Sequence, residues 1–104
     1  MSAPLGIDHV QLAMPEGGED RARAFYTDLL GMREVAKPSN LSTAGCWFEC
    51  GALQLHVGVD PDFRPARKAH PALLITDLAE FRARLAQAGA IMREDKPMAG
   101  YHRC

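Results

Sequence analysis

The sequence contains four histidines, the side chains best suited to metal binding and proton transfer near neutral pH: His9, His56, His70 and His102. A catalytic divalent metal ion needs three or four nitrogen or oxygen donors together with an open position for the substrate. His9, His70 and either Gln54 or His56 would supply three of these donors. A carboxylate ligand is not evident in the pattern, and Glu49 on a neighbouring predicted strand is the weaker alternative.

An internal repeat gives His9 and His70 equivalent positions. Their residue numbers differ by 61, and the same offset relates the Arg-Ala-Arg triplet at 21–23 to the one at 82–84. A histidine and a triplet in one shared register predict two copies of a single structural module. If the two copies pack with pseudo-two-fold symmetry, the two imidazoles converge across one cleft.

The first copy has the periodicity of a strand, a helix and three further strands. Alternating or short apolar segments predict the strands at 7–14, 32–35, 47–48 and 53–57. Helical spacing of apolar residues predicts a helix over 19–30 that ends at Gly31. His9 falls on the polar face of the first strand, and Gln54 and His56 share one face of the last.

The second copy repeats the start of the first and is shorter. A strand is predicted at 70–75 and a further strand at 91–93. Between them, Asp77 followed by Glu80 predicts a capped helix that ends at Gly89. Few residues follow this helix, so we expect the second module to lack its last strands, unless a partner supplies the missing edge.

Composition restricts the class of protein. The chain has 104 residues, of which 47% are hydrophobic and 24% charged, and its formal net charge is −1. These values predict one small globular domain without the bulk positive charge of a nucleic-acid-binding protein. No apolar run reaches the ~20 residues that cross a bilayer, and the N-terminus lacks the pattern of a signal peptide. We therefore predict a cytoplasmic protein with no membrane partner and, because small chains bury little surface alone, a homodimer.

The cysteines do not predict a disulfide framework. Cys46 and Cys50 lack the two-residue gap of a zinc knuckle or redox pair, and Cys104 leaves an odd total. Each is therefore interpreted as a buried structural thiol.

Three segments of the sequence resemble the vicinal oxygen chelate superfamily, which includes glyoxalase I, bleomycin-resistance proteins and extradiol dioxygenases. They are Ile-Asp-His-Val-Gln-Leu at 7–12, Ala-Phe-Tyr through Leu-Leu-Gly-Met at 24–32, and His-Pro-Ala-Leu-Leu-Ile at 70–75. The resemblance implies an α+β fold in which two βαβββ modules form a cupped, incomplete barrel around a metal or ligand.

The same resemblance implies a single glyoxalase-like domain over 1–104. Its first module would occupy 7–59 and its incomplete second module 70–104, with a connector at 60–69.

The resemblance also implies a ligand set. His9 matches the donor on the first strand of metal-using members, and His70 matches its counterpart in the second module. Gln54 matches the position at which glyoxalase-like members carry a glutamate, and His56 is the weaker alternative. The last ligand of the family, a glutamate on the final strand, has no counterpart within 1–104. The metal would be one divalent ion of iron, nickel, zinc or manganese.

Two functions are compatible with this reading. The first is a divalent-metal-dependent lyase, isomerase or dioxygenase acting on a small substrate with vicinal oxygens, in which the ion acts as a Lewis acid. Three cations of the connector would then bind an anionic tail of the substrate, namely Arg64, Arg67 and Lys68. Alternatively, these residues belong to a solvated linker.

The second function is a non-catalytic protein that binds a small molecule or an antibiotic, like the bleomycin-resistance proteins. Its cup would be lined by aromatic side chains, with candidates Trp47, Phe48, Phe63 and Tyr101. A chelator would abolish the activity of the enzyme and leave the binding protein unaffected.

Overall fold

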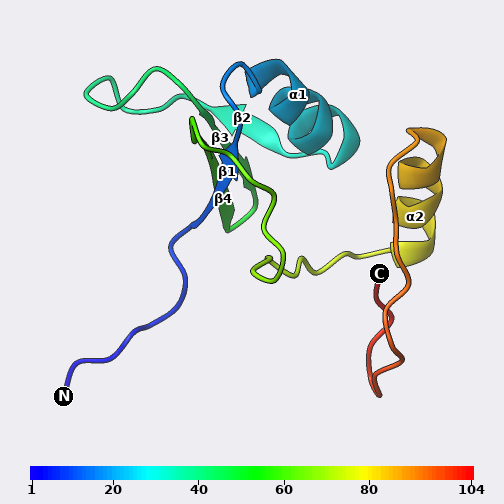
Figure 1. Ribbon diagram of the computed structural model, residues 1–104. Helices are drawn as coiled ribbons and strands as arrows, with labels where there is room; N and C mark the ends of the chain where they lie inside the picture. Colours follow the sequence, from blue (N-terminus) through cyan, green and yellow to red (C-terminus); the bar gives the residue numbers. More distant parts are fainter. The chain divides into compact units, whose positions relative to one another are not determined.

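Residues 1–104 are described by a computed structural model, shown in Figure 1. The chain contacts divide it into two units, Met1–Pro71 and Ala72–Cys104, which are described separately. No helix of either unit is long and apolar enough to span a membrane.

The first unit contains a four-stranded sheet in the order β1-β4-β3-β2. Its strands are β1 (Val10–Met14), β2 (Arg33–Val35), β3 (Cys46–Cys50) and β4 (Leu53–Val59). β1 pairs in parallel with β4, and the other two pairings are antiparallel. The element order is therefore βαβββ, as predicted for the first module. β1 is shorter than predicted, and His9 lies directly before it.

A continuous helical segment joins β1 to β2. α1 (Glu19–Arg23) runs directly into η1 (Ala24–Leu29), which is a π-helix. The Leu30 amide donates to the Phe25 carbonyl at 2.9 Å, the i to i−5 bond of that helix type. Gly31 ends the segment with a φ of +79°. The predicted helix and its glycine stop are confirmed, and the π-helical half was not predicted.

The core of the first unit lies between this helix and one face of the sheet. Phe48, Leu55 and Cys46 are its largest fully buried side chains, and smaller contributions come from Met14, Ala22, Met32 and Val57. The prediction that every cysteine is buried is wrong for Cys50 and Cys104, which are exposed. Cys50 ends β3 beside a turn, and Cys104 has no core to enter because the second unit has none.

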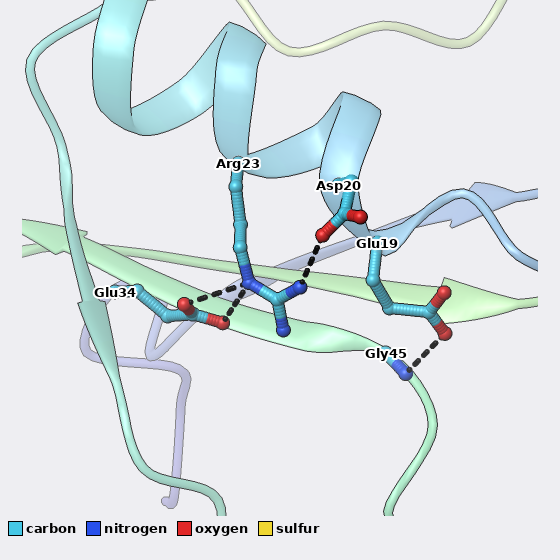
Figure 2. A network of polar contacts seen from close by, with 5 residues as sticks. All are labelled: Glu19, Asp20, Arg23, Glu34 and Gly45. Atoms are coloured by element: carbon cyan, nitrogen blue, oxygen red, sulfur yellow. Dashed lines mark hydrogen bonds and ion pairs between the residues drawn. The ribbon is translucent and has the colours of Figure 1, made fainter.

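A polar network fastens α1 to the sheet (Figure 2). The Nε atom of Arg23 donates to both carboxylate oxygens of Glu34 at 2.9 and 3.2 Å, and its Nη1 donates to Asp20 at 3.0 Å. These acceptors raise the pKa of the guanidinium. Glu19 accepts from the backbone amide of Gly45 at 3.3 Å. Gly45 has a φ of +91°, and an added Cβ would lie 2.6 Å from the Val57 carbonyl oxygen.

The second unit consists of one helix and irregular chain. α2 (Leu78–Gln87) begins as predicted, because the Asp77 carboxylate accepts from the Glu80 amide at 3.1 Å. It ends before Gly89, whose φ is +73°. None of the residues of this unit is buried.

The strands predicted at 70–75 and 91–93 are not formed. A strand exists only when its backbone pairs with a neighbour, and the second unit contains no ladder beyond the single bridge between Met98 and Tyr101. Leu74 and Ile91 are 99% and 91% exposed, whereas Leu73 and Ile75, the apolar face of the first predicted strand, are half-buried without forming a strand.

Candidate functional site

The candidate site lies on the face of the first unit's sheet that is opposite α1 and η1. Strand alternation directs Gln11 of β1, Trp47 of β3 and His56 of β4 to this face, because their neighbours Leu12, Phe48 and Leu55 are directed into the core. The strand register places His56 between Gln11 and Trp47.

Three rings form a continuous stack on this face. The indole of Trp47 and the imidazole of His56 are parallel within 1°, with ring centroids 3.8 Å apart. The imidazole of His9 covers the other side of His56, at 4.2 Å and 20°. His56 is therefore enclosed on both ring faces and is only 8% exposed.

His9 is oriented by its neighbour in sequence. Its Nδ1 lies 2.9 Å from the Asp8 carboxylate. When Nδ1 carries the proton for this bond, Nε2 holds the lone pair, which is the tautomer of a metal-ligating histidine with a carboxylate partner. His9 therefore presents Nε2 as a candidate donor, and its role as a metal ligand stays a prediction.

The stacked arrangement prevents His9 and His56 from binding the same metal ion. The lone pair of an imidazole nitrogen lies in the plane of its ring, and a metal–nitrogen bond is about 2.0–2.1 Å long. One ion cannot lie in both ring planes when the rings are nearly parallel and 4.2 Å apart. In this arrangement His56 supports His9, and the geometry favours Gln54 over His56 as a further donor.

Gln54, the second residue of β4, lies at the same end of the sheet as His9, which precedes the parallel strand β1. Val10 pairs with Leu55, so His9 and Gln54 each come one residue before that pair. The Gln54 amide nitrogen donates to Glu49 at 3.3 Å, which leaves the amide oxygen available as a ligand. Glu49 also binds Arg33, and these two contacts lower the pKa of its carboxyl group, with Gln54 the larger cause.

The other two histidines are outside this cluster. The Nδ1 of His70 lies 2.7 Å from the Lys68 carbonyl oxygen on the exposed connector, and no contact joins His70 to His9. His102 is exposed in the second unit. No three His, Cys, Asp or Glu side chains are grouped as a metal site. The ligand set with His70 therefore stays a prediction.

The residues predicted to line the cup have different outcomes. Trp47 lies on the polar face beside His56, and its role in lining a cup stays a prediction. Phe48, the next residue on the strand, is 0% exposed in the core, so the prediction that it lines a cup is wrong. Asp8 was not predicted, although its position next to His9 is the signal that identifies it. Lys37, whose charge acts on His56, was also not predicted, because a lysine in a polar loop shows no distinctive sequence pattern.

Comparison with known proteins identifies the family. No model of a known protein family matches the sequence, and no curated protein matches it. Among solved structures, a glyoxalase family protein from Bacillus anthracis is matched over 86% of this chain and 74% of its own, at 46% identity and a TM-score of 0.81. The chain belongs to the glyoxalase family. The predicted α+β fold and the predicted membership of the vicinal oxygen chelate superfamily are confirmed.

Two more distant structures share the fold of this glyoxalase-family chain. An E126Q mutant of FosX, a fosfomycin resistance protein from Listeria monocytogenes, has a TM-score of 0.74 at 17% identity, covering 93% of this chain and 77% of its own. That protein was crystallised with Mn(II) and a dihydroxypropylphosphonic acid. Lactoylglutathione lyase from Agrobacterium tumefaciens has a TM-score of 0.53 at 21% identity, with coverages of 99% and 80%. At these identities the likeness shows the fold alone.

The stack on the glyoxalase-family sheet predicts a pH-dependent fluorescence signal. Burial lowers the pKa of His56 below its ordinary value of 6.5, and the charges of His9 and Lys37 lower it further, against an opposing effect of Asp8. Trp47 is the only tryptophan, and a protonated imidazole stacked on an indole quenches its emission. We expect emission to fall on acidification, with a midpoint below 6.5 and no such transition in His56→Gln. A midpoint at or above 6.5, or a transition retained in the variant, would contradict the assignment.

Proposed function

We propose that this glyoxalase-family chain is a divalent-metal-dependent enzyme acting on a small substrate with two vicinal oxygens. The observation that carries the proposal is the Asp8–His9 pair at 2.9 Å, which leaves Nε2 of His9 as a metal donor on the polar face of the sheet. His9 is also the residue that the repeat makes equivalent to His70.

The proposed donor set is His9, His70 and the amide oxygen of Gln54. His9 precedes β1 and Gln54 is the second residue of the parallel strand β4, so both lie at the same end of the sheet face. His70 would add the second imidazole, because its Nδ1 is occupied by the Lys68 carbonyl and its Nε2 is free. Imidazole and carbonyl donors leave iron, nickel, zinc and manganese as candidates.

A bound divalent ion would supply Lewis-acid polarisation of the two substrate oxygens. The residues of the chain supply the surroundings. Asp8 holds the proton on Nδ1 of His9, and the Trp47–His56 stack restricts the rotation of the His9 ring. Glu49, ionised because of Gln54 and Arg33, places a carboxylate beside the Gln54 donor.

A second function, binding of an antibiotic or metabolite without catalysis, is favoured by two features of the same face. Gln54 is neutral, where the resemblance to glyoxalase-like members implies a glutamate. The half-buried indole of Trp47 also provides an aromatic surface beside the stack. The two functions differ in their dependence on metal.

The test is a metal count by elemental analysis, after the chain is stripped with chelator and reloaded with Mn(II), Ni(II) or Zn(II). The enzyme function predicts about one ion per chain, as for a single catalytic site. The ion should be lost in His9→Ala and His70→Ala, and retained in the matched control His102→Ala. Asp8→Asn should weaken metal binding by about 10–100-fold, as changes beyond the direct ligands do. A substoichiometric metal content in the wild-type chain, or a content unchanged by His9→Ala, would reject the metal site and leave the binding function.

A further inference from the structure

A concave region lies in the first unit, next to the ring stack. The chain between β2 and β3 encloses a pocket of about 480 Å³. Three loop hydroxyls, a lysine and the edge of the stack are among the groups that line it: Lys37, Ser39, Ser42, Thr43 and Trp47. The pocket therefore offers both hydrogen-bond donors and an aromatic ring.

Lys37 is the distinctive group of this pocket. Its side chain is half-buried, and its ammonium donates to the Ala44 carbonyl oxygen without a carboxylate partner. An ammonium has three N–H donors, so two remain for a ligand. A partly desolvated cation with unused donors is the arrangement that binds an oxyanion.

Of the charged side chains that line the pocket, Lys37 is the one without an ion-pair partner, although the carboxylates of Asp20 and Glu19 lie next to the lining. Arg23 and Glu34 also line it, but they pair with each other at 2.9 Å, and Asp20 accepts a further bond from Arg23. Figure 2 shows this network, in which Glu19 is directed to the Gly45 amide. The lining side chains therefore carry one net positive charge, located at Lys37.

The pocket shares Trp47 with the ring stack. Trp47 lines the pocket and stacks on His56, which stacks on His9. The pocket lining and His9 therefore belong to one array of stacked rings. The positive charge of Lys37 also contributes to lowering the pKa of His56, as expected for a group close to the stack.

We infer that this pocket binds an acidic group of a small-molecule ligand, either a carboxylate or a phosphonate, and that Lys37 is the residue that recognises it. That this ligand is the substrate of an enzyme rests on the proposed function. The oxyanion pocket itself does not, because none of its lining residues is a proposed metal donor.

The inference is tested by titrating the chelator-stripped chain with sodium acetate and with methylphosphonate. Sodium chloride at equal ionic strength is the reference, and Trp47 emission and amide chemical shifts are the readouts. Because metal is absent, the anion cannot be bound through an ion at His9. We expect saturable changes at residues 37–47, with the stronger of the two probes showing whether the pocket prefers a carboxylate or a phosphonate.

Variants of Lys37 separate recognition from structure. Lys37→Gln should weaken binding by about tenfold or more, as expected when a charge-assisted hydrogen bond is lost. Lys37→Arg should retain binding, and so should the matched control Lys68→Gln on the exposed connector. His9→Ala should also retain binding, so the pocket and the metal site can fail separately. Changes that do not saturate beyond the chloride reference, or equal affinity in Lys37→Gln, would overturn the inference.

Discussion

Replacing Phe48 by alanine is expected to lower the free energy of unfolding of the first unit by about 3–5 kcal/mol. Phe48 is 0% exposed, and its ring packs against Tyr26 of the π-helix with centroids 5.2 Å apart. Removing it opens a cavity between sheet and helix that a small core cannot close. Since native domains are stable by only about 5–15 kcal/mol, this loss is a large share of the total stability.

A matched control is available on the helix that covers this core. Phe25 is 42% exposed, so Phe25→Ala removes the same atoms from a position that is partly in water. Urea denaturation followed by Trp47 emission should give less than half the Phe48→Ala loss for this variant, because less apolar area leaves a buried environment. Equal losses for the two variants would show that the core is not centred on Phe48.

The fold of the first unit could be predicted because each segment has the periodicity of a helix or a strand. Each segment also has a neighbouring element against which it pairs or packs. Alternation around Leu12 identifies a half-buried strand, and β4 pairs with it. The segment at 70–75 has a similar pattern, yet no strand forms there, because no neighbouring backbone accepts its hydrogen bonds. Periodicity thus reports which face of a segment is apolar, while pairing depends on the rest of the fold.

The candidate site was predictable to a smaller extent, because its geometry depends on strand register. His9 and His56 were both candidate ligands in the sequence, but the sequence does not show that β1 and β4 pair with Gln11 opposite His56. That register brings the two imidazoles into a stack, which gives His56 a supporting role. The position of Lys37 depends in the same way on the conformation of an irregular loop.

Gln54→Glu is the variant that tests the donor set most directly, and its two expected effects have opposite signs. Without metal, the new carboxylate would lie where the Gln54 amide now contacts Glu49 at 3.3 Å. A hydrogen bond would be replaced by like-charge repulsion, so the melting temperature should fall. With Mn(II) or Ni(II), an anionic oxygen beside His9 should strengthen metal binding by roughly tenfold or more, because the charge acts on the ion at close range.

Metal binding to the folded state then reverses the loss of stability, because a ligand that binds only the native chain raises its melting temperature. The matched control is Gln11→Glu, which adds the same charge to the same sheet face on β1, opposite His56 and away from Glu49. It should show neither the large loss without metal nor the tighter metal binding. Thermal melts with and without metal, and metal titrations of both variants, measure these differences. If Gln54→Glu bound metal no more tightly than Gln11→Glu, Gln54 would not be a donor, and the site would have to be built from His9 with other partners.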